Sequence, residues 1–241
     1  MEETNEMEKG FLRETKMSRT KIIGTIAAFF LGQLVFGGFM AIFFIYGLGM
    51  EELSASSWLN FSVFGFLSLV FLGMHGKQFA HDWKRKGPMG KFIGQVLIGW
   101  AGLFAFSFVA NVIIMVLLGV EEGPANQYYI ENMAFAYPIL VIIMTVVFAP
   151  FVEEVVFRLA FMKGLERWPW VGILGSSFIF GLMHVIFTGD FIFLISYMAM
   201  GIPLGYSYYK TGNIWYPTAI HFLQNLYAIG MVLLLSAIGF Y

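Results

Sequence analysis

Cysteine is absent from the 241 residues, and charged residues make up only 12% of them. The first absence excludes disulfides and thiolate metal ligands, and it leaves the redox compartment open. Acidic and basic residues nearly balance, with a formal net charge of −1. A chain that binds nucleic acid usually carries a basic excess, so we expect no nucleic-acid partner.

Three catalytic signatures are also absent from the sequence. It contains no HExxH motif, no G-x-S-x-G motif and no glycine-rich phosphate loop. A serine hydrolase of the usual pattern and a nucleotide-driven machine are therefore disfavoured.

Apolar residues are abundant instead. They make up 59% of the chain, whereas a soluble domain is about 45–50% apolar and about 25% charged. Runs of spanning length fall at about 22–48, 57–74, 92–119, 136–161, 171–187, 191–209 and 214–238. This pattern predicts an all-α, polytopic transmembrane bundle of about seven spans, within a range of six to eight. We expect a cytoplasmic tail at 1–21 and one transmembrane domain over 22–241.

The basic residues give this bundle an orientation. On a seven-span topology every one of the 14 Lys and Arg residues falls on or near one side, while the loops of the other side carry only acids. The positive-inside rule makes the basic side cytoplasmic, so we expect the N-terminus inside. The basic segment after the second span holds His75 and His81, which we expect to be solvated.

Three ionisable groups interrupt the fourth apolar run, in the stretch FVEEVVFRLAF. Glu154 and Arg158 lie four residues apart with the acid first, which favours an ion pair on one helix face. Glu153 is rotated about 100° from Glu154 and is free for another role. By rise per residue it lies about 15 Å deep in a core about 30 Å thick. Pro150 removes one helical hydrogen bond beside these groups.

Further polar groups lie inside later spans at a similar depth. His184 falls in the fifth run, and His221 and Asn225 lie one turn apart in the seventh. Ionisable groups within a membrane are expensive and mark functional sites by default. A Glu–His pair can activate water, with a second His and an amide as oxyanion donors. Alternatively, Glu153, His184 and His221 could hold a catalytic zinc ion. These residues support either scheme.

At this point the chain resembles a known family. Glu153-Glu154-x-x-x-Arg158, Phe180-x-x-x-His184 and His221-x-x-x-Asn225 resemble the three motifs of the CAAX protease and bacteriocin-processing family, also called CPBP or Abi. The family includes the type II CAAX prenyl endopeptidases. The resemblance covers about residues 136–230 and departs at Leu159, where the family often has Gly.

The resemblance implies an intramembrane endopeptidase of a bacterial cell membrane. Glu153 would be the water-activating base with His184 as its partner, His221 and Asn225 would form the oxyanion site, and Glu154 and Arg158 would orient them. The family includes glutamate-type enzymes without a cofactor and zinc metalloproteases, and we favour the glutamate scheme. The substrates implied are prenylated C-termini or the precursors of bacteriocins and peptide pheromones.

Two other functions use the same buried groups. A non-proteolytic immunity protein or regulatory scaffold could bind a peptide or a sensor kinase there. A proton-coupled transporter would also need Glu and His within spans, but it predicts broken helices in both halves of the chain. The first three apolar runs carry no charged residue in their interiors, which disfavours the transporter.

Overall fold

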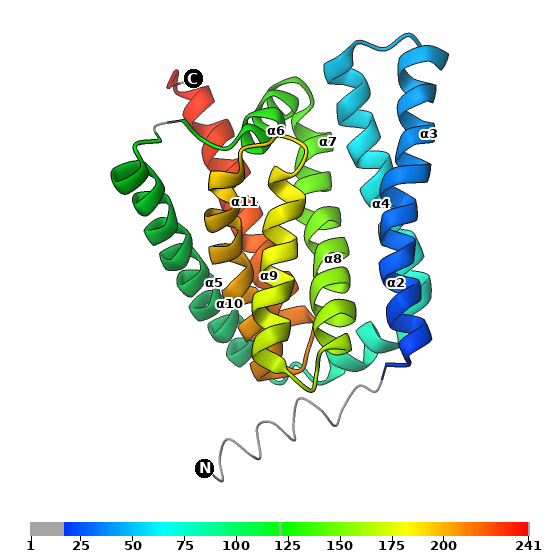
Figure 1. Ribbon diagram of the computed structural model, residues 1–241, viewed down its shortest axis with the longest axis vertical. Helices are drawn as coiled ribbons and strands as arrows, with labels where there is room; N and C mark the ends of the chain where they lie inside the picture. The colour runs from blue at the N-terminus through cyan, green and yellow to red at the C-terminus, as the bar shows by residue number, and fades with distance from the viewer. Residues whose placement is uncertain (1–16, 121, 241) are drawn as a thin grey trace.

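The computed structural model describes residues 17–120 and 122–240. Most of the predicted tail, together with Glu121, lies outside these residues. The described part of the chain forms helices joined by short turns, with no β-strand (Figure 1). Several helices run directly into π-helical turns, which are labelled η. The elements are α2 (Arg19–Leu31), η1 (Gly32–Phe36), α3 (Gly37–Ile42), η2 (Phe43–Gly47), α4 (Glu52–Lys84), α5 (Met89–Val112), η3 (Ile113–Leu117), α6 (Ala125–Ala136), α7 (Pro138–Ile142), η4 (Ile143–Phe148), α8 (Ala149–Glu154), η5 (Val155–Met162), α9 (Pro169–Val185), the 3₁₀ turn η6 (Phe191–Phe193), α10 (Leu194–Thr211) and α11 (Trp215–Ala237).

Six helical stretches of the described chain are long and apolar enough to cross a membrane: Arg19–Gly47, Glu52–Lys84, Met89–Leu117, Pro138–Met162, Phe191–Thr211 and Trp215–Ala237. The remaining predicted span corresponds to α9, which has 17 residues and a length of about 25 Å. That is slightly short of a hydrocarbon core of about 30 Å. The polytopic all-α prediction is confirmed, and the chain is a multi-pass integral membrane protein.

The stretch Pro138–Met162 is the central helix of the bundle. Of its most apolar 18 residues 56% are buried inside the protein, against 22–39% for the other five stretches. The outer helices instead present large apolar side chains outward, such as Phe39, Leu69 and Ile98. In a bilayer these side chains face lipid, so the burial pattern places the acidic motif at the protein centre.

Helices α9 and α10 pack closely through small residues. A Cβ atom added at Gly201 would lie 2.8 Å from the Cβ of Ser177, and one added at Gly205 would lie 3.3 Å from Ile173. Two helix backbones can approach this closely only where the side chains between them are small. The spacing of these two glycines on one face of α10 therefore serves helix packing.

The expectation that His75 is solvated is wrong. Helix α4 continues to Lys84, well past the apolar run 57–74, and the His75 side chain is only 1% exposed. Its Nε2 is hydrogen-bonded to the Thr25 hydroxyl on α2 at 2.9 Å. Phe71 and Phe79 lie one turn on either side of His75 and are also buried, so this face of α4 packs inward although its other face is charged. The side chain of His81 is 51% exposed, as expected.

The end of α4 is anchored to the start of α11. Asp82 is 1% exposed, and its carboxylate accepts a hydrogen bond from the backbone N–H of Ile214 at 3.2 Å. The Asn213 side chain donates to the Asp82 carbonyl at 2.7 Å, and the Trp215 indole donates to the carbonyl of Phe79 at 2.9 Å. A carboxylate beside a helix N-terminus satisfies free N–H groups and complements the helix dipole. These contacts fix the start of the helix that carries His221.

The basic residues gather at one end of the bundle. The start of α2 and the turns from α4 to α5, from η5 to α9 and from α10 to α11 all lie at the lower end in Figure 1, whereas α11 ends at the opposite side. Lys84 is the last residue of α4, Lys210 lies in the last turn of α10, and Arg167 belongs to the turn between η5 and α9. This arrangement supports the predicted orientation with the lower end in the cytoplasm.

Candidate active site

The two acids of the central helix lie at the end of α8, and Arg158 follows one turn later in η5. Glu154 and Arg158 form the ion pair that their spacing predicts, with 3.1 Å between Oε2 and Nε. Both side chains are fully buried. Arg158 also donates to the hydroxyl of Ser176 at 3.1 Å and to the carbonyl of Gly201 at 3.3 Å. Its guanidinium therefore ties the central helix to α9 and α10.

His221 of α11 lies between the two carboxylates. Its Nδ1 is 3.0 Å from Oε1 of Glu154, and its Nε2 is 3.6 Å from Oε2 of Glu153. The side chain of Glu153 is 12% exposed, whereas those of Glu154 and His221 are 0% and 2% exposed. Glu153 is therefore the less buried of the two carboxylates in this cluster.

His184 lies near the end of α9 and is held separately. Its Nδ1 is 2.7 Å from the carbonyl oxygen of Phe180. A carbonyl can only accept, so Nδ1 carries the proton and the Nε2 of a neutral His184 is a free acceptor. The Phe180 ring lies 4.5 Å from the His184 ring and 5.7 Å from the His221 ring, measured between centroids. The imidazole that contacts Glu153 is that of His221, and the pairing of Glu153 with His184 that the family resemblance implies stays a prediction.

Tyr197 of α10 was not identified from the sequence. Its ring stacks on that of His184 with 4.4 Å between centroids and 25° between planes. Its hydroxyl accepts a hydrogen bond from the side chain of Asn126, at the start of α6, at 3.4 Å. Tyr197 lies four residues before Gly201, on the helix face that packs against α9. That shared face was the available signal, but an aromatic residue in an apolar run rarely stands out.

Asn225 lies one turn beyond His221 on α11. Its side-chain Nδ2 donates to the backbone carbonyl of Thr145 in η4 at 2.8 Å. The side chain is part-buried. Asn225 thus contacts the central helix, but at its backbone rather than at the carboxylates.

The zinc alternative requires Glu153, His184 and His221 to converge on one point. Among residues 17–120 and 122–240 no group of three His, Asp or Glu side chains is placed to hold a metal ion. Within the site, His221 is engaged by a carboxylate on each side. His184 belongs to a different helix, α9, and is held there by the carbonyl of Phe180 in the same helix. The side chains as arranged do not fit a three-ligand zinc site.

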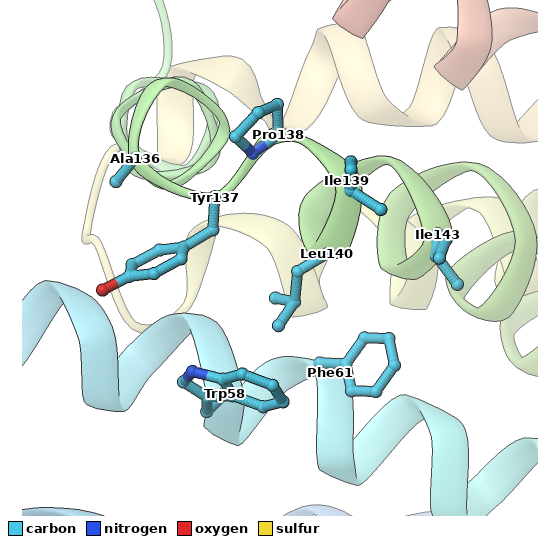
Figure 2. A pocket seen from close by; sticks show the side chains of 8 residues that line it. All are labelled: Trp58, Phe61, Ala136, Tyr137, Pro138, Ile139, Leu140 and Ile143. Atoms are coloured by element: carbon cyan, nitrogen blue, oxygen red, sulfur yellow. The ribbon is translucent and has the colours of Figure 1, made fainter.

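An apolar pocket of about 460 Å³ lies apart from this cluster, between α4 and the junction of α6 with α7. Figure 2 shows Trp58 and Phe61 of α4 facing Leu140 and the ring of Tyr137 across it. The Tyr137 hydroxyl is hydrogen-bonded to the Ser54 side chain at 2.6 Å. All lining residues belong to the apolar stretches or their ends, so the pocket suits hydrocarbon rather than a charged group.

The fold and the site together define a multi-pass helical membrane protein with a buried carboxylate–imidazole cluster. Residues 135–227 match the family described as "Type II CAAX prenyl endopeptidase Rce1-like". The match spans all three motifs and confirms the family resemblance. No solved structure matches the chain.

Three bacterial proteins are similar in sequence. A Bacillus subtilis protein named "Putative membrane peptidase YdiL" is 28% identical over 62% of this chain and 61% of its own length. A Mycoplasma capricolum protein named "Uncharacterized protein" is 32% identical over 47% of this chain and 34% of its own length. The Lactococcus lactis "UPF0177 protein YvdC" is 24% identical over 64% of this chain and 57% of its own length. The chain thus spans less than two thirds of each relative.

Proposed function

We propose that the protein is an intramembrane endopeptidase that hydrolyses peptide bonds of membrane-associated substrates with a water molecule activated by Glu153. The observation that carries this proposal is the pairing of the less buried carboxylate, Glu153, with an oriented imidazole. Glu153 faces the Nε2 of His221, and the Nδ1 of the same ring is fixed by Glu154. A base within reach of water and a partner held by a third group form the usual arrangement of a hydrolase site.

The charges of the cluster determine what each group can do. Glu153, Glu154 and Arg158 together carry one excess negative charge, which a His221 protonated on both nitrogens neutralises. Buried charges are tolerated when they are paired in this way. His221 would then donate its Nδ1–H to Glu154 and present its Nε2–H toward the reacting carbonyl.

The proposed reaction uses one proton relay. The Glu153 carboxylate takes a proton from water, and the water oxygen bonds to the carbonyl carbon while the carbonyl electron pair moves to oxygen. The Nε2–H of His221 stabilises this oxyanion. When the C–N bond breaks, the leaving amine takes the proton from Glu153, and the carboxylate is regenerated.

In this mechanism His184 contributes a further hydrogen-bond acceptor. Its Nδ1 is occupied by the carbonyl of Phe180, so its Nε2 can orient the attacking water or the substrate N–H. Tyr197 holds the ring in place by stacking on its face. The proposed substrates are prenylated C-termini or the precursors of bacteriocins and peptide pheromones, because these place a peptide bond at a membrane.

The test is cleavage of candidate prenylated and precursor peptides by the purified protein in detergent. Glu153→Gln keeps the shape of the side chain but cannot accept the water proton, so we expect at least a roughly hundredfold loss of rate. Glu131→Gln, which alters an acid on α6 far along the chain, is the matched control. A Glu153→Gln enzyme that cleaves at the wild-type rate would refute the mechanism.

Two further comparisons separate the alternatives. Activity that survives a strong chelator supports the glutamate scheme, and activity lost to the chelator and restored by zinc overturns it. If the biological effect of the protein persists in Glu153→Gln, the non-proteolytic scaffold is the better explanation.

A further inference from the structure

One backbone carbonyl of the central helix lacks its helical partner. In η4 the backbone N–H of Ala149 donates to the carbonyl of Met144, five residues back. In the same register the next N–H, that of residue 150, would reach the carbonyl of Thr145. Residue 150 is proline and has no N–H to donate. The helix therefore leaves the carbonyl of Thr145 unpaired in the middle of a membrane span, where a lone carbonyl is costly.

The side chain of Asn225 satisfies that carbonyl. Its Nδ2 lies 2.8 Å from the Thr145 oxygen, and this contact joins α11 to η4. One turn earlier on α11, His221 contacts both Glu154 and Glu153. The two contacts lie on the same face of α11, and together they fix its rotation and height against the central helix.

We propose that Asn225 is a positioning residue, whose amide replaces the hydrogen bond that Pro150 removes and thereby holds His221 against Glu153. An asparagine amide has two N–H groups, and this assignment concerns the one that meets Thr145. The assignment predicts that the effects of mutations at positions 225 and 150 are not additive. The Asn225 side chain and a helical N–H at position 150 would both donate to the Thr145 carbonyl, so the loss of one matters less when the other is present. The activity readout rests on the proposed function, whereas the stability readout does not.

The experiment is a double-mutant cycle with Asn225→Ala, Pro150→Ala and the combined variant, measured by melting temperature in detergent and by kcat/KM. Asn225→Ala leaves the Thr145 carbonyl unpaired, so we expect a melting temperature lower by a few degrees and a roughly tenfold loss of kcat/KM. Alanine at position 150 supplies the missing N–H. In the Pro150→Ala background, the same Asn225→Ala change should therefore have a much smaller effect on both quantities.

Two further variants sharpen the comparison. Asn225→Leu keeps roughly the size of the side chain and offers no donor to the carbonyl, so it should be at least as destabilised as Asn225→Ala. Gln224→Ala removes the neighbouring amide, which accepts from the Trp100 indole instead, and its effect should be the same in both backgrounds.

The result that overturns the proposal is additivity. An oxyanion donor acts on the substrate, so its loss would reduce kcat/KM by the same factor with proline or with alanine at position 150 and would leave the melting temperature unchanged. If no peptide is cleaved by the wild type, the proposed function fails, but coupling of the melting temperatures still decides whether Asn225 fills the gap left by Pro150.

Discussion

Glu153 and Glu154 are neighbours in the chain with different surroundings. Both oxygens of Glu154 face cationic or donor groups, Arg158 on one side and His221 on the other, and its side chain is fully buried. Glu153 faces the other nitrogen of the His221 ring at 3.6 Å and keeps 12% of its side chain exposed. Glu154 is thus suited to hold the site together, and Glu153 is suited to react with water.

This difference predicts that replacing each glutamate by glutamine will change the stability of the protein by very different amounts. Glu154→Gln leaves the buried Arg158 without its counter-charge, which costs about 3–5 kcal/mol of stability. Glu153→Gln removes a less buried carboxylate whose contact with His221 is longer, at 3.6 Å, so it should leave the melting temperature within a few degrees of the wild type. Thermal unfolding of the two variants in one detergent checks this. Equal stability of both variants would show that Glu154 and Arg158 are not a structural pair.

The sequence predicted the polar residues of the site but not all of their partners. The spacing of Glu154 and Arg158 predicted their ion pair, because both belong to one helix. It could not predict that His221 would face Glu153, or that Tyr197 would stack on His184, because those contacts join different helices. Helix spacing fixes which residues share a face, whereas the rotation of one helix against another depends on packing along its whole length.

At the level of single elements, the contact between α9 and α10 is a close helix approach beside the site. Gly201 lies against Ser177, and its carbonyl accepts from Arg158. A side chain at position 201 would therefore separate the two helices and move the carbonyl that holds the guanidinium.

We expect Gly201→Ala to destabilise the protein by about 1–3 kcal/mol, because the added Cβ would lie too close to Ser177. Gly230→Ala is the matched control on α11, since a Cβ there meets no atom within 4 Å. That change should be neutral or stabilising by about 0.5–1 kcal/mol. Adding Ser177→Gly to Gly201→Ala should recover part of the loss. Thermal unfolding of the three variants and the wild type measures these differences, and equal melting temperatures for Gly201→Ala and Gly230→Ala would contradict the packing argument.

The ends of the helices were not predicted from the apolar runs of the sequence. The apolar run 57–74 predicted the middle of α4, but the helix extends from Glu52 to Lys84. A search for apolar runs ends where charges begin, whereas a helix continues as long as its backbone hydrogen bonds and one packed face persist. The same reason explains why His75 was assigned to a loop and why α6, with 12 residues and modest apolarity, was not predicted.

For the whole molecule, the absence of cysteine makes the orientation easy to test. Lys84→Cys should lie on the cytoplasmic side and Glu122→Cys on the other, and both positions are exposed. A membrane-impermeant thiol reagent should label only Glu122→Cys in intact cells and should label both after the membrane is permeabilised. The native chain has no thiol of its own and gives the background. Labelling of only Lys84→Cys in intact cells would invert the orientation.

The length of α4 has a mechanical consequence. The helix has 33 residues, so it is about 50 Å long, well beyond a hydrocarbon core of about 30 Å. Its end is fixed to the start of α11 through Asp82, while Trp58, about 36 Å along the axis from that anchor, lines the apolar pocket (Figure 2). Long helices adapt to thinner bilayers by tilting.

A tilt of about 5° about the anchor would move Trp58 by about 3 Å. Helix α4 would then act as a lever with its fulcrum at the cytoplasmic surface. The width of the pocket would follow the thickness of the surrounding bilayer. The lipid composition of the membrane would then control how wide the apolar pocket is.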